Sequence, residues 1–257
     1  MLPIRDHNPS GATPWVVYTL MVLNIGIYLW GLAFWQGEEA IFAVYRDYAL
    51  IPERVADGRS FAPLLTSTFL HAGFMHLAGN MLFLWIFGDN LEDEMGHLPF
   101  LIFYVLSGLG AGLLHVLASP SSPIPTIGAS GAIAGVMGGY LLMFPKARVD
   151  ILLILIVFFR IFPVPAWVML GVWLAMQFIG GVGSDPDQGG VAYWAHAGGF
   201  FVGLILTIPL WLKRGGRAFW DQTHGAPPHP EHEYNFSPTR IPRVPRKDKR
   251  LPGPWGR

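Results

Sequence analysis

The sequence of 257 residues contains no cysteine and little charge. Without cysteine, disulfides, thiolate metal sites and a cysteine nucleophile are all excluded. Lys, Arg, Asp and Glu make up 13% of the residues, about half the share usual in soluble domains, while 52% are hydrophobic. The net charge is zero and the C-terminal basic residues are interspersed with proline, so nothing favours nucleic acid as a partner. The composition indicates a protein that contacts the lipid bilayer.

The chain is expected to form one membrane domain with polar ends. Residues 1–13 lack the pattern of a cleavable signal peptide, so the first apolar stretch should stay in the mature protein. We expect a cytoplasmic N-terminal segment at 1–13 and a membrane domain at 14–212. Residues 213–257 are rich in proline and charge, which predicts a disordered cytoplasmic tail.

Long apolar stretches predict six membrane crossings, since a helix needs about 20 mainly apolar residues to cross a bilayer. Prolines and glycines around residues 119–129 divide one long uncharged stretch into two spans. We therefore expect an all-α fold, a bundle of six transmembrane helices at about 14–37, 74–90, 98–118, 130–144, 165–179 and 193–212. The acidic run at 89–94 is expected to be a solvated loop that ends the second span.

The apolar segment 149–162 is too short to count as a crossing and contains Asp150 and Arg160. We expect an interfacial or re-entrant segment, whose conformation the sequence leaves open. Six crossings place both termini on one side of the membrane. Of the 17 Lys and Arg residues, only three lie in segments assigned to the other side, so the termini should be cytoplasmic, in a bacterial-type plasma membrane.

Unusual polar residues stand at the starts of the second, fourth and sixth spans, which all run in the same direction. His76 and Asn80 lie four residues apart on one helical face, Ser130 opens the fourth span and His196 opens the sixth. The fourth span has only about 15 residues and covers roughly 22 Å of a core about 30 Å thick. Ser130 should therefore begin below the outer surface. Non-helical backbone such as residues 123–129 is tolerated at that depth only when it is buried in protein or faces a water-filled cavity, and we hypothesise a wet pocket around Ser130.

Glycines predict that the fourth and sixth spans pack closely, because small residues spaced by four let two helix backbones approach in lipid. These glycines are Gly131, Gly135 and Gly139 on the fourth span and Gly199 and Gly203 on the sixth. Such packing would bring Ser130 within reach of His196. A serine hydroxyl needs an adjacent base to become a nucleophile, and a histidine titrates near neutrality. The backbone N–H of Ser130 and the side chains of His76 and Asn80 are candidate donors to an oxyanion, and no acidic third member is evident.

Three motifs in this order, HxxxN at 76–80, GASG at 128–131 and AHAGG at 195–199, resemble the rhomboid family of intramembrane proteases. The resemblance covers roughly residues 14–212. It implies that Ser130 and His196 form a catalytic dyad, that His76 and Asn80 help bind the oxyanion, and that Gly128 shapes the loop before the nucleophile. It also implies cleavage of single-span membrane proteins at small residues near the outer interface. Some members carry an aromatic residue four positions after the serine, stacked on the catalytic histidine, where this chain has Ala134.

Other classes of function fit the sequence less well. A catalytically silent rhomboid-like protein that binds membrane clients is the second hypothesis, but both Ser130 and His196 are present. A channel or transporter would show paired repeats with broken helices, and no such symmetry is found. His71 and His76 lack the intervening Glu of a zinc protease motif, so neither a metal nor another cofactor is expected. GASGA does not match GxSxG, which excludes an α/β-hydrolase.

Overall fold

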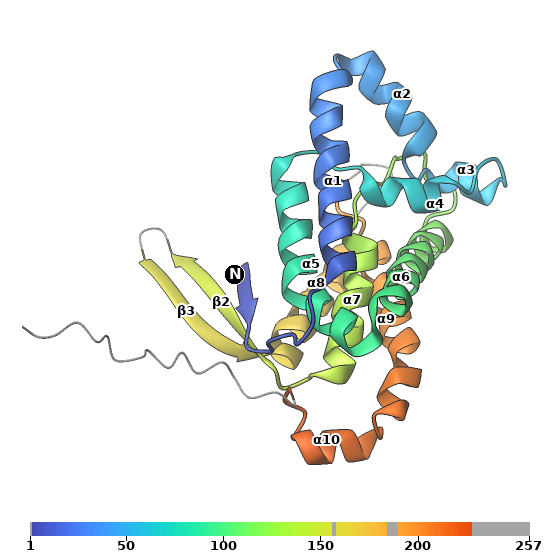
Figure 1. Cartoon of the computed structure of the whole chain (residues 1–257). Helices are drawn as coiled ribbons and strands as arrows, with labels where there is room; N and C mark the ends of the chain where they lie inside the picture. The colour runs from blue at the N-terminus through green and yellow to red at the C-terminus, as the bar shows by residue number, and fades with distance from the viewer. Residues whose placement is uncertain (1, 156–157, 184–189, 228–257) are drawn as a thin grey trace, which may run out of the picture.

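The computed structural model describes residues 2–155, 158–183 and 190–227, and it is mostly helical (Figure 1). Among the described residues, four helices are long and apolar enough to cross a membrane: α1 (Trp15–Phe34), α6 (His97–Ala118), α8 (Ala166–Gly183) and α9 (Tyr193–Lys213). The short helices α4 (Pro63–Thr66) and η1 (Ser67–Phe69) meet α5 (Phe74–Met95) at a bend of 98°, and the bent pair passes the same test when its parts are taken together. The chain is an integral membrane protein.

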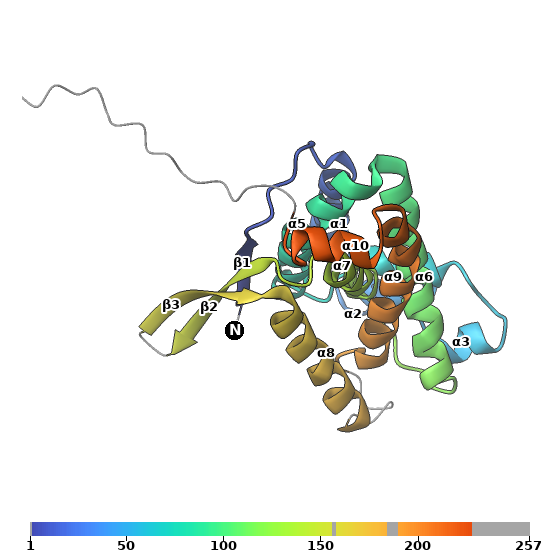
Figure 2. The ribbon, with the colours of Figure 1, turned by 90° about the horizontal axis from the view of Figure 1, so that it is seen from below.

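Helix α7 (Ser130–Met143) lies in the middle of the bundle (Figure 2). Its 14 residues rise about 21 Å, which is less than the thickness of a bilayer core. Every residue from Ala132 to Tyr140 is buried, so α7 contacts protein on all sides rather than lipid. A helix that is apolar all round belongs in the core, and this explains how so short a helix remains in a membrane domain.

The segment between α1 and α4 contains two short helices, α2 (Glu38–Tyr48) and α3 (Pro52–Ala56). Between them, Leu50 exchanges backbone hydrogen bonds of 3.0 and 2.8 Å with Thr126, just before α7. Gly128 donates its N–H to the carbonyl of Ser67 at 2.9 Å. These long-range bonds anchor the non-helical backbone that leads to Ser130.

The structure is mostly helical as expected, but it also contains a three-stranded antiparallel sheet that the expected all-α fold does not include. The order of the strands is β1 (Leu2–Asp6), β2 (Arg148–Leu155), β3 (Phe158–Pro165). Most of the apolar segment 149–162 therefore belongs to the antiparallel pair of β2 and β3. Prolines that block a helix are tolerated here, because both β1 and β3 are edge strands. Val149 and Ile151 are buried in the core, so the base of the hairpin packs on the helices. The sheet forms because the first residues of the chain pair with β2 across about 145 positions of sequence.

Beyond the sheet, the N-terminal segment forms polar bonds to the helices. Tyr140, on α7, donates its hydroxyl to Asp6 at 2.7 Å, and Ser10 donates to Asp89 on α5 at 3.0 Å. The side-chain amide of Asn90 donates to the carbonyl of Asn8. The segment therefore holds one end of α7 against α5.

The acidic run at 89–94 is not a solvated loop as expected, but the last turns of α5. Glu92 is buried and accepts the N–H groups of Val16 and Val17, both at 2.8 Å, at the start of α1. His97 lies 2.6 Å from the same carboxyl group. The first N–H groups of a helix have no hydrogen-bond partner within the helix, and they carry a partial positive charge. A buried carboxylate both accepts their hydrogen bonds and compensates this charge.

The first part of the expected C-terminal tail is helical. Helix α10 (Arg217–Thr223) has Phe219 buried, and Trp220 donates its indole N–H to the carbonyl of Leu142 at 3.0 Å. Residues 228–257, for which disorder is expected, lie outside the described residues. The expected domain boundaries stay predictions.

Burial of Asp6 predicts how the docking of the N-terminal segment depends on pH. Burial, together with the nearby charge of Asp89, raises the pKa of Asp6 from 3.8 to about 8. The folded protein then binds a proton that the unfolded chain releases, so stability should fall as the pH rises from about 4 to 8. The side chain in Asp6→Asn is neutral at every pH and keeps an acceptor for Tyr140. We therefore expect the stability of this variant to depend less on pH, and its melting temperature at pH 9 to be higher than that of the wild type.

Thermal unfolding in detergent between pH 5 and 9 measures the effect, with Asp57→Asn at an exposed position as the matched control. A difference of one bound proton changes the free energy of unfolding of the wild type by at most about 1.4 kcal/mol per pH unit. Parallel curves for the wild type and Asp6→Asn would contradict the prediction.

Candidate active site

Ser130 stands at the first turn of α7, after a backbone segment that only glycine allows. Gly128 has φ of 122°, a conformation that other residues rarely adopt. A Cβ atom at Gly128 would lie 2.7 Å from Nε2 of His76 and 3.6 Å from Nδ2 of Asn80. The backbone before Ser130 is therefore pressed against the two polar side chains of α5.

Helices α7 and α9 touch backbone to backbone. A Cβ at Gly199 would lie 2.0 Å from the carbonyl oxygen of Gly131, and a Cβ at Gly203 would lie 2.0 Å from that of Gly135. Gly131 and Gly135 also receive α6, since a Cβ at Gly135 would meet the Cβ of Ser107 at 2.4 Å. The predicted glycine contact is present and includes a third helix.

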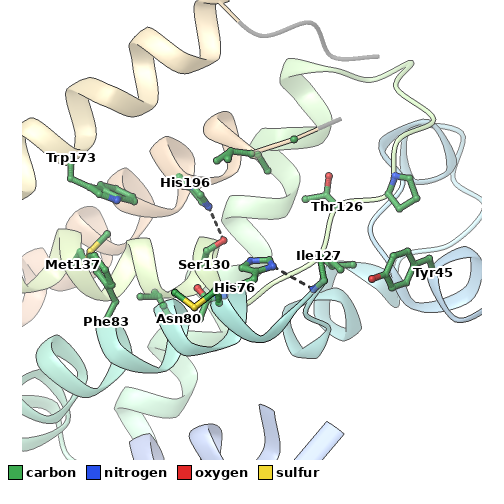
Figure 3. Close-up of a pocket in the computed structure, with 18 residues that line it drawn as sticks. Tyr45, His76, Asn80, Phe83, Thr126, Ile127, Ser130, Met137, Trp173 and His196 are labelled. Atoms are coloured by element: carbon green, nitrogen blue, oxygen red, sulfur yellow. Dashed lines mark hydrogen bonds between the residues drawn. The ribbon is translucent and has the colours of Figure 1, made fainter. Parts of the chain in front are cut away.

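This approach places Ser130 and His196 in direct contact (Figure 3). The Oγ of Ser130 lies 2.7 Å from Nε2 of His196, a hydrogen-bond distance. Both residues belong to first turns, Ser130 opening α7 and His196 following Tyr193 by three positions in α9. The pair has the geometry that a nucleophile and its general base require.

Two residues of α8 contact the other side of His196, and the sequence reasoning missed both. The Oε1 of Gln177 lies 2.8 Å from Nδ1 of His196. The ring of Trp173 lies 5.8 Å from the imidazole, centroid to centroid, at an angle of 32°. Gln177 could have been noticed as the one amide in the apolar run PAWVMLGVWLAMQFI, because polar side chains inside membrane segments are costly and often functional.

His76 and Asn80 lie on the face of α5 that borders the same cavity as Ser130. Asn80 is 7% exposed, and its Nδ2 has no hydrogen-bond partner among the described residues. A buried hydrogen-bond donor without an acceptor costs free energy, and an acceptor that binds there removes this cost. The amide of Asn80 is therefore available to a negatively charged oxygen formed beside Ser130.

The cavity around the pair has a volume of about 510 Å³, enough for several side chains of a peptide. Most of its lining is apolar, and none of the described residues that line it carries a carboxylate. The described lining residues include Met75, Phe83, Pro125, Thr126, Ile127, Ile133, Met137 and Val191. In the part of the chain that the structure describes, no three His, Cys, Asp or Glu side chains gather as a metal site would require.

Comparison with known proteins identifies the family of this chain. The family model of the Rhomboid domain matches residues 58–213. The chain belongs to the rhomboid family. The matched range includes the four motif residues and the two α8 residues that contact His196.

Among the relatives of this rhomboid is Rhomboid protein 1, mitochondrial, of Saccharomyces cerevisiae, which is 31% identical over 74% of this chain and 51% of that protein. RHOMBOID-like protein 5 of Arabidopsis thaliana is 32% identical over 58% of this chain and 44% of its own length. Rhomboid protease GluP of Bacillus subtilis is 31% identical over 57% of this chain and 26% of its own length. The rhomboid thus spans about half the length, or less, of these curated relatives.

The contact between α7 and α9 yields a stability prediction. A Cβ at Gly203 would meet backbone atoms of Gly135 at 2.0 and 2.4 Å, which cannot rotate away, so Gly203→Ala must push the two helices apart. We expect a loss of about 1–3 kcal/mol, as for other overpacked cores. Gly171→Ala on α8 is the matched control, since nothing lies within 4 Å of its Cβ position, and it should be neutral or stabilising. Thermal unfolding in detergent compares them, and equal losses in both would refute the contact.

Proposed function

We propose that this rhomboid is an intramembrane serine endopeptidase that cleaves transmembrane proteins with Ser130 and His196. The observation that carries the proposal is the distance of 2.7 Å between Oγ of Ser130 and Nε2 of His196, inside a cavity of a membrane domain. The name of the Bacillus subtilis relative, a rhomboid protease, supports the same class of activity.

The proposed reaction passes protons through His196 in two stages, formation and hydrolysis of an acyl-enzyme, with two proton transfers in each stage. Ser130 Oγ attacks the carbonyl carbon of the scissile peptide bond while its proton passes to Nε2 of His196. The tetrahedral oxyanion accepts hydrogen bonds from the N–H of Ser130 and the side chains of His76 and Asn80, and Gly128 holds the preceding loop against them. The C–N bond then breaks as Nε2 returns the proton to the leaving amine, and water releases the acyl group by the reverse sequence.

The proposed arrangement in the membrane has six crossings, with α5 and α7 added to the four long apolar helices. Both termini would then be cytoplasmic, because most Lys and Arg residues fall on their side. We place the protein in a bacterial-type plasma membrane, with Ser130 below the outer surface. Substrates would be single-span proteins cut at small residues near that surface.

Cleavage of a single-span test substrate in proteoliposomes tests the dyad. Ser130→Ala and His196→Ala should each lower kcat/KM at least about 10³-fold, because either change removes nucleophilic catalysis. Ser130→Ala should also abolish covalent labelling by a fluorophosphonate. Ser107→Ala, at another buried serine of a membrane helix, is the matched control and should retain labelling.

Two outcomes would overturn the proposal. Cleavage that survives Ser130→Ala would refute the mechanism. A wild-type protein that neither labels nor cleaves across a broad substrate panel, yet retains those substrates on co-purification, would favour the client-binding alternative.

The free amide of Asn80 predicts a second effect on activity. Asn80→Ala should lower kcat about 10²-fold with little change in KM, since the donor is used only when the oxyanion forms. Asn24→Ala, which removes a buried amide on α1, controls for the loss of a polar group in a membrane helix. An equal loss of kcat in both variants would contradict a specific role for Asn80.

A further inference from the structure

Gln177 is placed to control which nitrogen of His196 carries the proton. Its side chain is buried, with the residue 6% exposed, and its Oε1 lies 2.8 Å from Nδ1 of His196. Its Nε2 donates to the carbonyl oxygen of Trp173, one turn earlier on α8, at 3.0 Å. A carbonyl oxygen has two lone pairs, so that of Trp173 can accept this bond in addition to its helical one.

The bond to Trp173 sets the orientation of the amide. In the opposite orientation Oε1 would face the Trp173 carbonyl, and two acceptors would meet in a buried place without a proton between them. The favoured orientation therefore turns Oε1 toward His196. Because Oε1 can only accept, Nδ1 of a neutral His196 must carry the proton.

This tautomer is the one that proposed catalysis needs. With the proton on Nδ1, Nε2 has a free lone pair, and that lone pair faces the hydroxyl of Ser130 at 2.7 Å. With the proton on Nε2, that N–H would donate to Oγ of Ser130, and Nδ1 and Oε1 of Gln177 would face each other as two acceptors. His196 would then have no lone pair at Nε2 to accept the serine proton. Among the described residues, the hydrogen bond found at Nδ1 of His196 is the one to Oε1 of Gln177.

Trp173 adds a second constraint from the same face of α8. Residues 173 and 177 lie four apart, so both side chains point toward α9. The Trp173 ring lies beside the imidazole, tilted by 32° and 5.8 Å away between centroids, whereas Ala134, four residues after Ser130, has no ring to place there. One helix thus supplies both the acceptor and the ring that hold His196.

We propose that Gln177 is a positioning residue, which holds His196 in its Nδ1–H tautomer and stabilises the imidazolium formed when Ser130 gives up its proton. The inference rests on the proposed function of Ser130 and His196. A neutral amide performs here the orienting task that a carboxylate has in serine protease triads, without the cost of burying a charge. When His196 becomes positively charged, the bond from Nδ1–H to Oε1 strengthens, since charge-assisted hydrogen bonds are the stronger class.

Two nearly isosteric variants separate positioning from packing. Gln177→Met removes the acceptor and should lower kcat about 10- to 100-fold with KM within about twofold, because His196 loses its orienting partner. Gln177→Glu keeps an oxygen acceptor and should restore kcat to within about fivefold of the wild type. Met176→Leu, at the adjacent and exposed position of α8, is the matched control and should leave kcat unchanged.

A second measurement reads the tautomer without activity. In protein labelled with ¹⁵N-histidine, the His196 resonances, assigned by their loss in His196→Ala, should show a protonated Nδ1 and a bare Nε2 in the wild type. Gln177→Met should shift them toward the other tautomer. An unchanged tautomer and unchanged kcat in Gln177→Met, or an equal loss of kcat in the Met and Glu variants, would overturn the proposal.

The two proposals fail in different ways. If the wild type cleaves nothing, the protease function fails, while a tautomer that changes in Gln177→Met still supports the positioning role. If Ser130→Ala is inactive but Gln177→Met behaves as the wild type in both measurements, the protease function stands and the role of Gln177 is refuted.

Discussion

The backbone contact between α7 and α9 is the constraint on which the rest of the site depends. Lipid offers no hydrophobic force to drive two apolar helices together, so their association relies on close packing. Glycines at 199 and 203 let α9 approach the carbonyl oxygens of Gly131 and Gly135, at positions where a Cβ would lie only 2.0 Å away. Each glycine costs helix propensity, about 1 kcal/mol relative to alanine. Glycine is nevertheless needed at these positions, because a wider separation of α7 and α9 would break the hydrogen bond between Ser130 and His196.

Helix α7 is held at its other end by polar contacts that are unrelated to the site. Tyr140 donates to Asp6 in β1, and Trp220 on α10 donates to the carbonyl of Leu142 at the end of α7. Because α7 is shorter than the bilayer core is thick and is covered by protein on all sides, its position along the bundle axis depends on such contacts. The contact between Tyr140 and Asp6 thus helps to fix the position of α7, and with it that of Ser130, within the bundle.

Much of this arrangement follows from local properties of the sequence. The helices that span the membrane agree with the apolar stretches to within a few residues, because length and hydropathy decide them. Ser130, His196, His76 and Asn80 stood out as polar groups at the starts of apolar helices, and the structure brings all four to one cavity.

The β-sheet, the role of Glu92 and the contact of Gln177 could not be read in the same way. Strands β2 and β3 are as apolar as the membrane helices, and β3 contains prolines. Their conformation depends on the pairing of β2 with β1, which lies near the N-terminus. Glu92 belongs to an acidic run that resembles a solvated turn until the start of α1 is placed against it. The hydrophobic pattern of a sequence predicts the helix to which a residue belongs. These contacts depend instead on which other element packs beside that helix.

Helix α8 contacts His196 although much of its own surface is exposed. Its outer face exposes Trp167, Val172 and Ile179, and aromatic rings connect its inner face to α9, with Trp173 beside Phe200 and Phe178 beside Trp194 and Phe201. A displacement of α8 by about 1 Å would lengthen the bond from Gln177 to His196 beyond the usual limit of a hydrogen bond. Helix α7 holds Ser130 in a core that is buried on all sides, whereas His196 on α9 is oriented by α8 at the periphery. In the proposed mechanism the two members of the dyad would therefore differ in how firmly they are held, and the packing of rings between α8 and α9 would decide how well His196 is oriented to accept the proton of Ser130.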